Sequence, residues 1–483
     1  MRSQVLKELS FDVVVIGGGP AGLTAATTLR NNQLSVALLD ERVTLGGQIY
    51  KRIGKGFEVK NPKYLGKDFL AGKSLIDNFN QSGASTFLET IVLTIENSSV
   101  IAANSKDGTF ALKFKKLIVA TGAYDRPVAF PGWTLPGVIT AGAAQTLVKS
   151  QQFSPGSNMV FAGSGPLALA FPAQMAALGA PVKIVFEAAK VPSISALLRL
   201  ALTLQGNFDL IRDAIKYRIQ LFKHKIPFKY RTIVIAAHGT ERVERVTFAK
   251  VDSKWNPIEG SEKTIDADTL IIGYGFLPSI EILRLLDCQL DFNDNRGGFI
   301  AVTDIWGATS TENVFAVGDG TGVAGSYVAK AQGELAALKI ASELNCISDL
   351  QLKLCSEMPL KALKQREKFQ SAINQMFKLG EGIYNLADDQ TIICRCESVR
   401  LCELKPIIQS ATDASVSKAY SRAGMGLCQG RNCQRQIAAL IAARHEIKIP
   451  EVPVATPRLP IKPVAIGLIA DNSVTEEKYF FNE

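Results

Sequence analysis

The stretch Phe11-Asp12-Val13-Val14-Val15-Ile16-Gly17-Gly18-Gly19-Pro20-Ala21-Gly22 decides the fold. Its first half is an apolar run that is typical of a buried strand, and its second half is a glycine-rich turn. A helix is expected over 23–31, and a second strand over 35–39 ends at Asp40, which is 40 − 17 = 23 residues after the first glycine. Strand, glycine loop, helix, strand and acid in this order predict a dinucleotide-binding unit.

Each glycine of this loop has its own physical task. Gly17 permits the tight turn, Gly19 lets the backbone approach a pyrophosphate because it has no Cβ, and Gly22 lets the helix and strand pack closely. The helix N-terminus offers free N–H groups to phosphates, and Asp40 can accept both ribose hydroxyls. The candidate cofactor-binding residues are Gly17, Gly19, Pro20, Ala21, Gly22 and Asp40, followed by Glu41, Arg42, Gly47 and Gln48. The alternative is a glycine turn that binds no ligand.

Length, composition and charge set the class of protein. The chain has 483 residues, 47% of them hydrophobic and 20% charged, which indicates a globular protein of two or three domains. The net charge is 54 − 45 = +9. The basic clusters at 51–73, 216–231 and 361–368 do not alternate with aromatic residues, so no nucleic-acid partner is expected. We interpret them as solvated faces, with docking on a partner or a membrane as the alternative.

The position of the first strand and the character of the longest uncharged run predict a cytoplasmic location. The first strand begins too early to leave room for a signal peptide. The longest uncharged run, 158–182, contains a glycine turn and Pro172, so it fits a buried strand and a helix kinked at Pro172 better than a membrane span. Peripheral contact with the inner face of the membrane stays as an option.

Two later segments indicate that the expected dinucleotide is FAD. Strands ending in Ala120-Thr121-Gly122 and in Gly318-Asp319 resemble the later FAD motifs of the two-dinucleotide-fold flavoproteins. The resemblance implies that Asp319 contacts the ribityl and pyrophosphate region of FAD. It also implies that a helix beginning near 325–326 points its N-terminus at the flavin, where it stabilises negative charge on the reduced ring.

A second glycine loop follows in the middle of the chain. A strand over 159–162 leads into Gly163-Ser164-Gly165-Pro166-Leu167-Ala168, and a further strand ends at Glu187. Gly163, Gly165 and Glu187 are candidates for binding a nucleotide, and the acid favours NAD over NADP. The alternatives are ADP, ATP or an empty fold. No cysteine lies between 151 and 267, so disulfide reduction is not expected.

Five of the cysteines lie between 394 and 433. Cys394-Arg395-Cys396 and the pair Cys428 and Cys433 place four thiolates in CxC and Cx₄C spacings, which can hold a [2Fe–2S] cluster. The surrounding glycines leave backbone N–H groups free to point at the sulfurs. Structural zinc, which usually prefers Cx₂₋₄C pairs, is the alternative. We assign Cys402 to packing.

The cysteine segment over 391–440 resembles the bacterioferritin-associated-ferredoxin-like [2Fe–2S] domain. Together with both glycine loops and Phe130-Pro131-Gly132-Trp133-Thr134-Leu135-Pro136-Gly137-Val138, it makes the chain resemble a particular family. This is the large flavoprotein subunit of opine oxidases, hydroxyproline and proline dehydrogenases and hydrogen cyanide synthase, with the sarcosine oxidase α subunit as a more distant relative. The resemblance specifies the type of subunit and leaves the substrate open.

The resemblance implies partners for this chain. They are a D-amino-acid-oxidase-like flavoprotein that oxidises the amine, a small ferredoxin-like [2Fe–2S] subunit, and FMN held between subunits in some members. The chain is then an electron-transfer subunit that delivers electrons to a quinone or another acceptor. The alternative is a self-sufficient NADH-dependent reductase of a ferredoxin or quinone. No catalytic residue is assigned within the chain.

The expected fold class is α/β. It consists of two Rossmann-like dinucleotide-binding domains, one inserted in the other, and a small helical [2Fe–2S]-binding domain. The expected layout is an FAD domain at 8–124 and 290–345, an inserted NAD-type domain at 155–287, a helical connector at 346–390, the cluster domain at 391–446 and an extended tail at 447–483. The prolines of the tail favour an extended segment laid over another surface, with a strap between subunits as one option.

Overall fold

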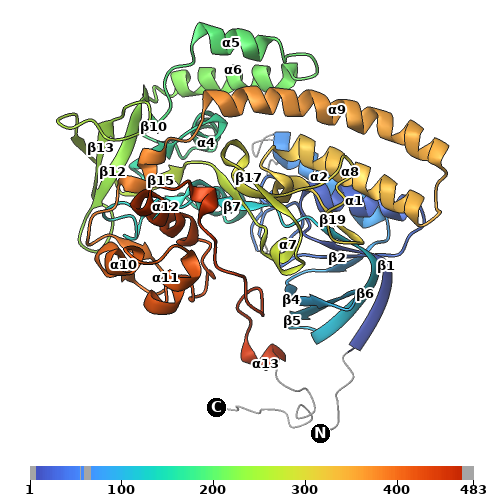
Figure 1. Ribbon diagram of the computed structural model, residues 1–483. Helices are drawn as coiled ribbons and strands as arrows, with labels where there is room; N and C mark the ends of the chain where they lie inside the picture. The colour runs from blue at the N-terminus through green and yellow to red at the C-terminus, as the bar shows by residue number, and fades with distance from the viewer. Residues whose placement is uncertain (1–6, 55, 59–66, 470–483) are drawn as a thin grey trace, which may run out of the picture.

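The computed structural model describes residues 7–54, 56–58 and 67–469. The fold is α/β, as predicted, with a mixed sheet and a parallel sheet side by side and a helical C-terminal region (Figure 1). In Figure 1 the first sheet lies on the right, in blue and cyan, and the second lies on the left. The last part of the predicted tail, 470–483, and the first six residues lie outside the described residues.

The first sheet has the strand order β3-β2-β1-β6-β5-β4, and β19 also pairs with β6. β1 is parallel to β2 and β6, with Ile16 opposite Leu39 and Val119. The carboxyl ends of β1, β6 and β19 therefore meet at one edge, where the glycine loop begins. The strands are β1 (Lys7–Ile16), β2 (Val36–Leu39), β3 (Ser85–Phe87), β4 (Ile91–Glu96), β5 (Ser99–Asn104), β6 (Gly108–Val119) and β19 (Val314–Ala316).

Helices α1 (Pro20–Asn31), α2 (Lys67–Gln81) and α8 (Ser326–Glu343) accompany this sheet. The apolar residues of α1 and α8 share a core with β1. The two helices cross so closely that a Cβ on Gly333 would lie 2.2 Å from the carbonyl oxygen of Ala21. Small residues thus bring the helix that begins at residue 326 against the helix of the glycine loop.

The second sheet is fully parallel, with the order β11-β10-β9-β15-β8. Its strands are β8 (Val138–Thr140), β9 (Met159–Gly163), β10 (Ile184–Glu187), β11 (Phe228–Tyr230) and β15 (Thr269–Gly273). An antiparallel sheet of β12 (Thr232–His238), β13 (Arg245–Lys250) and β14 (Lys263–Asp266) extends this half. The helices of this half are α3 (Ala141–Gln145), α4 (Pro166–Ala177), α5 (Ile194–Ala201) and α6 (Phe208–Lys223), and α4 runs on through Pro172.

Two short antiparallel strands, β7 (Ala123–Asp125) and β16 (Phe276–Pro278), carry the chain between the two halves. β16 is followed by α7 (Glu281–Leu285) and by the hairpin of β17 (Leu290–Asn293) and β18 (Gly298–Ala301). The second half is thus inserted into the sequence of the first, because β19 returns to the first sheet after it.

The connector contains the 28-residue helix α9 (Asp349–Met376), which a Ser348 capping box begins. The helix ends earlier than the predicted helical connector at 346–390, and the segment after it is irregular apart from a short 3₁₀ turn (Glu381–Asn385). The C-terminal region contains β20 (Ile392–Cys394), β21 (Val399–Arg400), α10 (Leu401–Ile408), α11 (Ala414–Ser421) and α12 (Gln434–His445). Cys402 lies on α10 and is half-buried.

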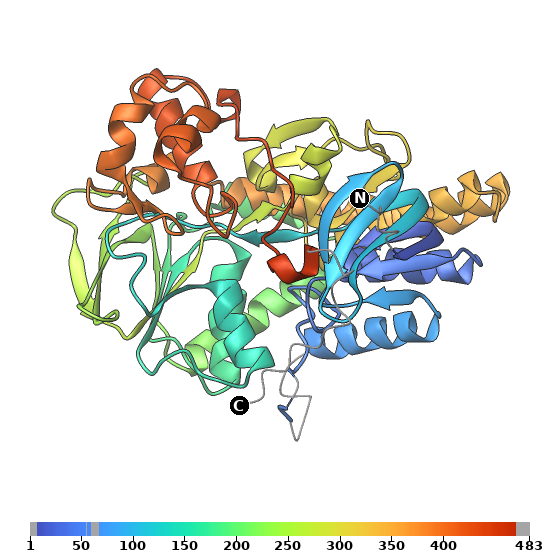
Figure 2. The same cartoon turned by 90° about the horizontal axis from the view of Figure 1, so that it is seen from below.

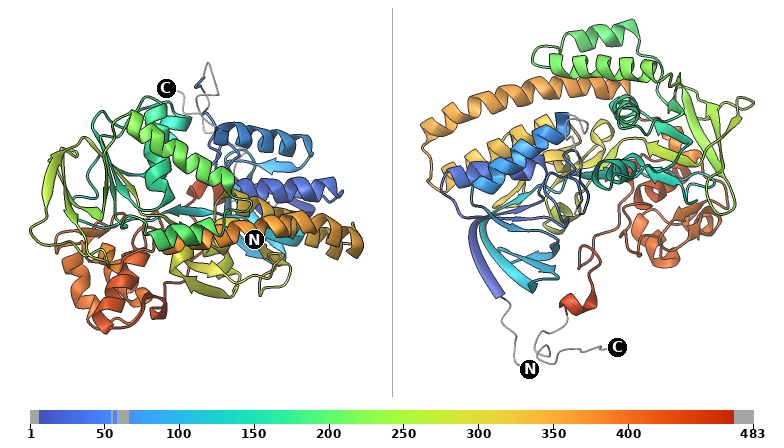
Figure 3. Two further views of the ribbon diagram at one scale, coloured as in Figure 1. Left: turned by 90° about the horizontal axis from the view of Figure 1, so that it is seen from above. Right: turned by 180° about the vertical axis from the view of Figure 1, so that it is seen from behind.

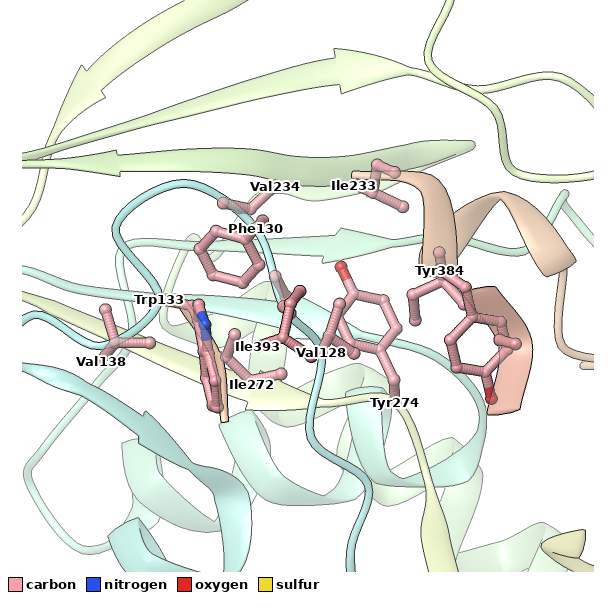
Figure 4. Close-up of a cluster of buried hydrophobic side chains, with 14 of the residues drawn as sticks. Val128, Phe130, Trp133, Val138, Ile233, Val234, Ile272, Tyr274, Tyr384 and Ile393 are labelled. Atoms are coloured by element: carbon pink, nitrogen blue, oxygen red, sulfur yellow. The ribbon is translucent and has the colours of Figure 1, made fainter. Parts of the chain in front are cut away.

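One continuous hydrophobic core joins the C-terminal region to the second half. Figure 4 shows Tyr384 and Ile393 from the C-terminal part beside Phe130, Trp133 and Tyr274 of the second half. The indole N–H of Trp133 donates to the carbonyl oxygen of Ile392 at 2.6 Å. The cysteine-bearing region is therefore fixed in place.

The tail runs back to the first sheet and ends, within the described residues, in α13 (Ile466–Ile469) (Figure 2). Ile461 is buried in the core of that sheet, and its N–H donates to the carbonyl oxygen of Leu93 at 3.1 Å. Lys462 pairs with Glu41. Between the 3₁₀ turn Ile449–Glu451 and α13 the tail has no regular secondary structure, and it lies on its own chain, while its extended conformation stays a prediction.

Candidate functional site

The first glycine loop has the expected local geometry. Gly17 has φ +112°, and a Cβ on it would lie 2.3 Å from the carbonyl oxygen of Ala120. A Cβ on Gly22 would lie 1.9 Å from the carbonyl oxygen of Gly17. Gly19, the N-cap of α1, differs, because the nearest atom to a Cβ there is the Cα of Gly47 at 4.0 Å. The loop therefore leaves space beside Gly19 and the helix N-terminus, where a pyrophosphate can bind.

Asp40 stands at the end of β2 beside this loop. Its carboxylate accepts the N–H of Gly18 at 2.7 Å and the N–H of Arg42 at 2.8 Å. Burial raises the pKa of Asp40. The side chain is half-buried, so it supports the loop and still reaches the surface where a ribose would lie. Its neighbour Glu41 instead points at Lys462 of the tail.

The other predicted FAD segments converge on the same edge. A Cβ on Gly318 would lie 3.2 Å from the Cβ of Ala21, so the Gly-Asp turn touches the first helix. Burial raises the pKa of Asp319, which accepts the N–H of Ala324 at 3.3 Å just before α8 begins. The Oγ1 of Thr121 donates to the carbonyl oxygen of Ser279 at 2.7 Å, and Gly122 follows with φ +70° and open space around it.

Lys51 is a site residue that the sequence reasoning missed. We expected a solvated face for the cluster at 51–73, and this is wrong at Lys51, whose exposed fraction is 5%. Burial lowers its pKa to about 8, and its Nζ donates to Gln48, one of the predicted cofactor-binding residues. Asp125 on β7 raises the pKa of Lys51 by its charge. Its place three residues after the Gly46-Gly47-Gln48 turn was the only sequence signal for it.

The second glycine loop repeats the backbone pattern of the first. A Cβ on Gly163 would lie 2.2 Å from the carbonyl oxygen of Gly273, as Gly17 meets Ala120 in the first sheet. Glu187 accepts the N–H of Gly165 at 3.0 Å and of Ala189 at 2.9 Å. However, Glu187 has an exposed fraction of 1%, and burial raises its pKa to about 7. The acid expected to meet a ribose is closed off from solvent.

The segment after α9 covers this loop. A Cβ on Gly165 would lie 3.7 Å from the Cβ of Phe377, so the aromatic residue stands over the glycine that should face a pyrophosphate. The covering segment is anchored farther on. A Cβ on Gly380 would lie 2.3 Å from the indole ring of Trp255, and the hydroxyl of Tyr384 accepts a hydrogen bond from Arg126 at 2.8 Å.

The four predicted cysteine ligands lie together. Hydrogen bonds join Cys394 to Cys433 and Cys396 to Cys428, so each contact joins one cysteine of each motif. Cys394 and Cys433 are fully buried, whereas Cys396 is exposed, and none of the four is in a disulfide. A Cβ on Gly426 would lie 2.4 Å from the Cβ of Cys396, so only glycine lets the second motif come this close.

Backbone N–H groups surround these sulfurs. Gly424 donates to the Sγ of Cys394 at 3.4 Å, and Glu397 donates to the same sulfur. Gly430 and Asn432 donate to Cys428. Such amide nests fit anionic sulfur. Among the described residues, however, no three His, Cys, Asp or Glu side chains are arranged so that they could hold a metal ion, and the cluster stays a prediction.

The cysteine region abuts the FAD half at Tyr124. Tyr124, on β7 two residues after Gly122, lines a cavity together with Gly424 and Cys433. Salt bridges hold the same contact, from Arg431 to Glu281 at 3.0 Å and from Arg435 to Asp294 at 2.7 Å. The segment expected to touch a flavin therefore leads, within two residues, to a side chain that shares a cavity with Cys433.

Comparison with known proteins identifies the family. Residues 11–334, more than half of the chain, match the family model described as pyridine nucleotide-disulphide oxidoreductase. The chain belongs to this family. A second model, the sarcosine oxidase A3 domain, matches residues 409–472 of this oxidoreductase.

Relatives of the oxidoreductase match along nearly its whole length. The HcnB subunit of hydrogen cyanide synthase from Pseudomonas protegens is 30% identical over 94% of this chain and 97% of the relative. An opine oxidase subunit from Agrobacterium tumefaciens is 29% identical over 95% of this chain and 91% of the relative. The resemblance to these subunits, expected from the motifs, is confirmed, and the protein is a flavin-dependent oxidoreductase.

Among solved structures, L-proline dehydrogenase from P. horikoshii shares the fold of this oxidoreductase. Its TM-score is 0.68 at 21% identity, and the match covers 97% of this chain and 81% of that one. Within the described residues, no helix has the length and apolar character needed to cross a membrane.

Proposed function

We propose that this chain is the FAD- and [2Fe–2S]-containing electron-transfer subunit of a multi-subunit dehydrogenase that acts on CH–NH or CH–NH₂ donors. The observation that carries the proposal is the placement of the cysteine quartet beside Tyr124, at the end of the predicted flavin-binding strand. The relatives that match along nearly the whole chain are named as subunits, which supports the same proposal. When bound, FAD supplies two-electron acceptance and the cluster supplies one-electron transfer.

The residues of the chain have separate tasks in this proposal. The N–H groups at the start of α1 bind the pyrophosphate, and Asp40 holds the adenosine ribose. Gly318 and Asp319 present the N-terminus of α8 to the flavin. Lys51, buried beside Gln48, supplies positive charge near the ring. Cys394, Cys396, Cys428 and Cys433 hold the cluster inside their nest of backbone amides.

The proposed partners are those that the family resemblance implies, and the names of the relatives as subunits support an assembly with other chains. A D-amino-acid-oxidase-like flavoprotein subunit oxidises an opine, proline, hydroxyproline or glycine, and a small ferredoxin-like subunit joins the complex. A quinone or another acceptor receives the electrons, and FMN at a subunit interface is a further cofactor of this arrangement. The purified chain should then reduce no dye with these amines, and activity should appear when a D-amino-acid-oxidase-like partner subunit from the same organism is added.

Metal analysis tests the cluster. Anaerobically purified protein should contain roughly two iron atoms and two labile sulfides per chain. Cys428→Ser should abolish the iron and the visible absorbance of the cluster and retain FAD. Cys402→Ala is the matched control, because this cysteine lies outside the quartet on α10, and it should keep both cofactors. Zinc in place of iron, or equal loss of iron in both variants, would overturn the cluster assignment.

The closed second loop counts against the NADH-dependent alternative. Phe377 stands over Gly165, and Glu187 is withdrawn from solvent, so NADH has no open place to bind. We expect no fast bleaching of the flavin when the holoprotein is mixed anaerobically with NADH. Bleaching within the first seconds would favour the self-sufficient reductase.

A further inference from the structure

The helices α5 and α6 carry an unusual surface. Large apolar side chains stand in solvent along both helices and the turns beside them, with exposed fractions that reach 86% at Leu202 and 85% at Phe222. They are Val191, Ile194, Leu197, Leu198, Leu202, Phe208, Ile215, Ile219 and Phe222. An apolar patch of this extent on a protein surface usually marks a binding face. We call these residues the α5–α6 patch.

The patch residues of α6 lie on one face of the helix. Phe208, Ile215, Ile219 and Phe222 follow one another by seven, four and three residues, so they form one stripe along α6. The opposite side of α6 is occupied, because Leu221 is buried and packs in the core around α4. The exposed stripe is therefore an additional apolar face, which the fold itself does not use.

Basic residues accompany this apolar face. Lys and Arg residues stand exposed at 190, 199, 212, 216, 218, 223 and 225. The acidic residues of the same stretch do not balance them, since Asp209 pairs with Arg366 at 3.1 Å and Asp213 is buried. The free charge of the patch is thus positive throughout, and Arg212, Lys216 and Lys223 lie along the edge of the α6 stripe.

The patch is held firmly at one end of the molecule. Figure 3 shows α5 and α6 as an outer layer lying over the long helix α9. Asp209 is paired with Arg366 of α9, and the side chain of Asn207, which is fully buried, donates to the carbonyl oxygen of Gln365 at 3.3 Å. The apolar side chains consequently project from helices that are attached to α9.

We propose that the α5–α6 patch docks this protein on an anionic phospholipid surface. Apolar side chains edged by cations match the acyl and phosphate layers of such a surface at the same time. A second copy of the patch is a poor occupant, because two uniformly positive faces would repel each other. The docking would bring a subunit that feeds electrons to a quinone close to a membrane-dissolved acceptor, but it does not depend on that proposed function.

Vesicle flotation of the full-length holoprotein tests the proposal. The protein should float with vesicles rich in phosphatidylglycerol and remain behind with pure phosphatidylcholine, and high salt should weaken the binding. Leu198→Ser combined with Phe222→Ser, and separately Lys216→Glu combined with Lys223→Glu, should each reduce the bound fraction by about tenfold or more. Leu350→Ser combined with Leu354→Ser, which removes exposed apolar residues from α9, is the matched control and should bind normally.

Bound FAD and the melting temperature are measured for every variant, and these surface changes should leave both unchanged. The proposal is overturned if the wild type ignores anionic vesicles, or if the control variant loses binding as strongly as the patch variants. A third outcome would also overturn it. If the wild type does not float, and light scattering shows that it forms a protein complex that the patch variants do not form, the patch is a protein interface.

Discussion

The two glycine loops share a backbone but differ in what lies over them. In both, the first glycine meets the carbonyl of a neighbouring strand, and an acid at the next strand end accepts a loop N–H. Gly19 is half-buried, with Gly47 4.0 Å from a Cβ placed there, whereas Gly165 is buried, with Phe377 3.7 Å from a Cβ placed there. The comparison teaches that a dinucleotide fingerprint specifies a turn, and that the surroundings of the turn decide whether a ligand can enter.

Among the substitutions in the two loops, Gly22→Ala is expected to have the largest effect, which is a loss in the free energy of unfolding. Its Cβ would lie 1.9 Å from the backbone oxygen of Gly17, and neither backbone can move away without separating helix from strand. We expect a loss of about 3 kcal/mol or more in the free energy of unfolding, measured by urea denaturation. A variant as stable as the wild type would show that the first loop is looser than its contacts indicate.

The free energy of unfolding should depend on pH through Glu187, the acid of the second loop. The pKa of Glu187 is raised from 4.5 to about 7. The folded protein therefore binds a proton that the unfolded chain has lost, and stability falls as pH rises from about 4.5 through about 7, by up to about 3 kcal/mol. Glu187→Gln should remove this slope in urea titrations at a series of pH values. Equal slopes in both proteins would mean that Glu187 is ionised in the fold.

Gly19→Ala probes the space beside Gly19 in the first loop. Gly19 has φ −81°, which alanine adopts freely, and among the described residues other than its chain neighbours the nearest atom to the new Cβ is the Cα of Gly47 at 4.0 Å. The apoprotein should keep its melting temperature, while FAD affinity falls by roughly thirtyfold, about 2 kcal/mol, because the methyl group occupies the place of the pyrophosphate. Unchanged FAD affinity, measured by flavin fluorescence, would place the cofactor elsewhere.

The smallest effect is expected from Phe377→Ala. Removing the ring should uncover Gly165 and raise the affinity for ADP by about tenfold, measured by calorimetry. Met376→Ala, one residue earlier and also half-buried, is the control and should leave the affinity unchanged. If the wild type binds ADP as tightly as the Phe377 variant, the second loop is open in solution and the contrast between the loops disappears.

Much of the fold follows from local sequence patterns. The strand over 11–16, the loop, α1 and the helix starting at 326 were predicted within a few residues, because glycine spacing and apolar runs act locally. The start of β1 at Lys7 was not, since its first residues are strand only by pairing with β6. The expected kink at Pro172 stays a prediction.

The covering of the second loop had no sequence signal. Phe377 lies more than 200 residues after Gly165, and nothing in either segment announces the contact. Lys51 was misplaced for a similar reason, since a lysine among other lysines gives no sign of burial. The cysteine spacing, by contrast, correctly predicted four side chains close together, while the identity of what they bind stays a prediction.

The tail also carries a consequence for how the protein is made. Ile461 completes the core beneath the first sheet, and Lys462 holds Glu41 beside the first loop. A ribosome makes strand β1 more than 400 residues before it makes Ile461. The amino-terminal half must therefore wait, with part of its core uncovered, until translation is almost over. Chaperones that shield nascent chains should consequently matter more for this protein than for one whose halves are finished in order.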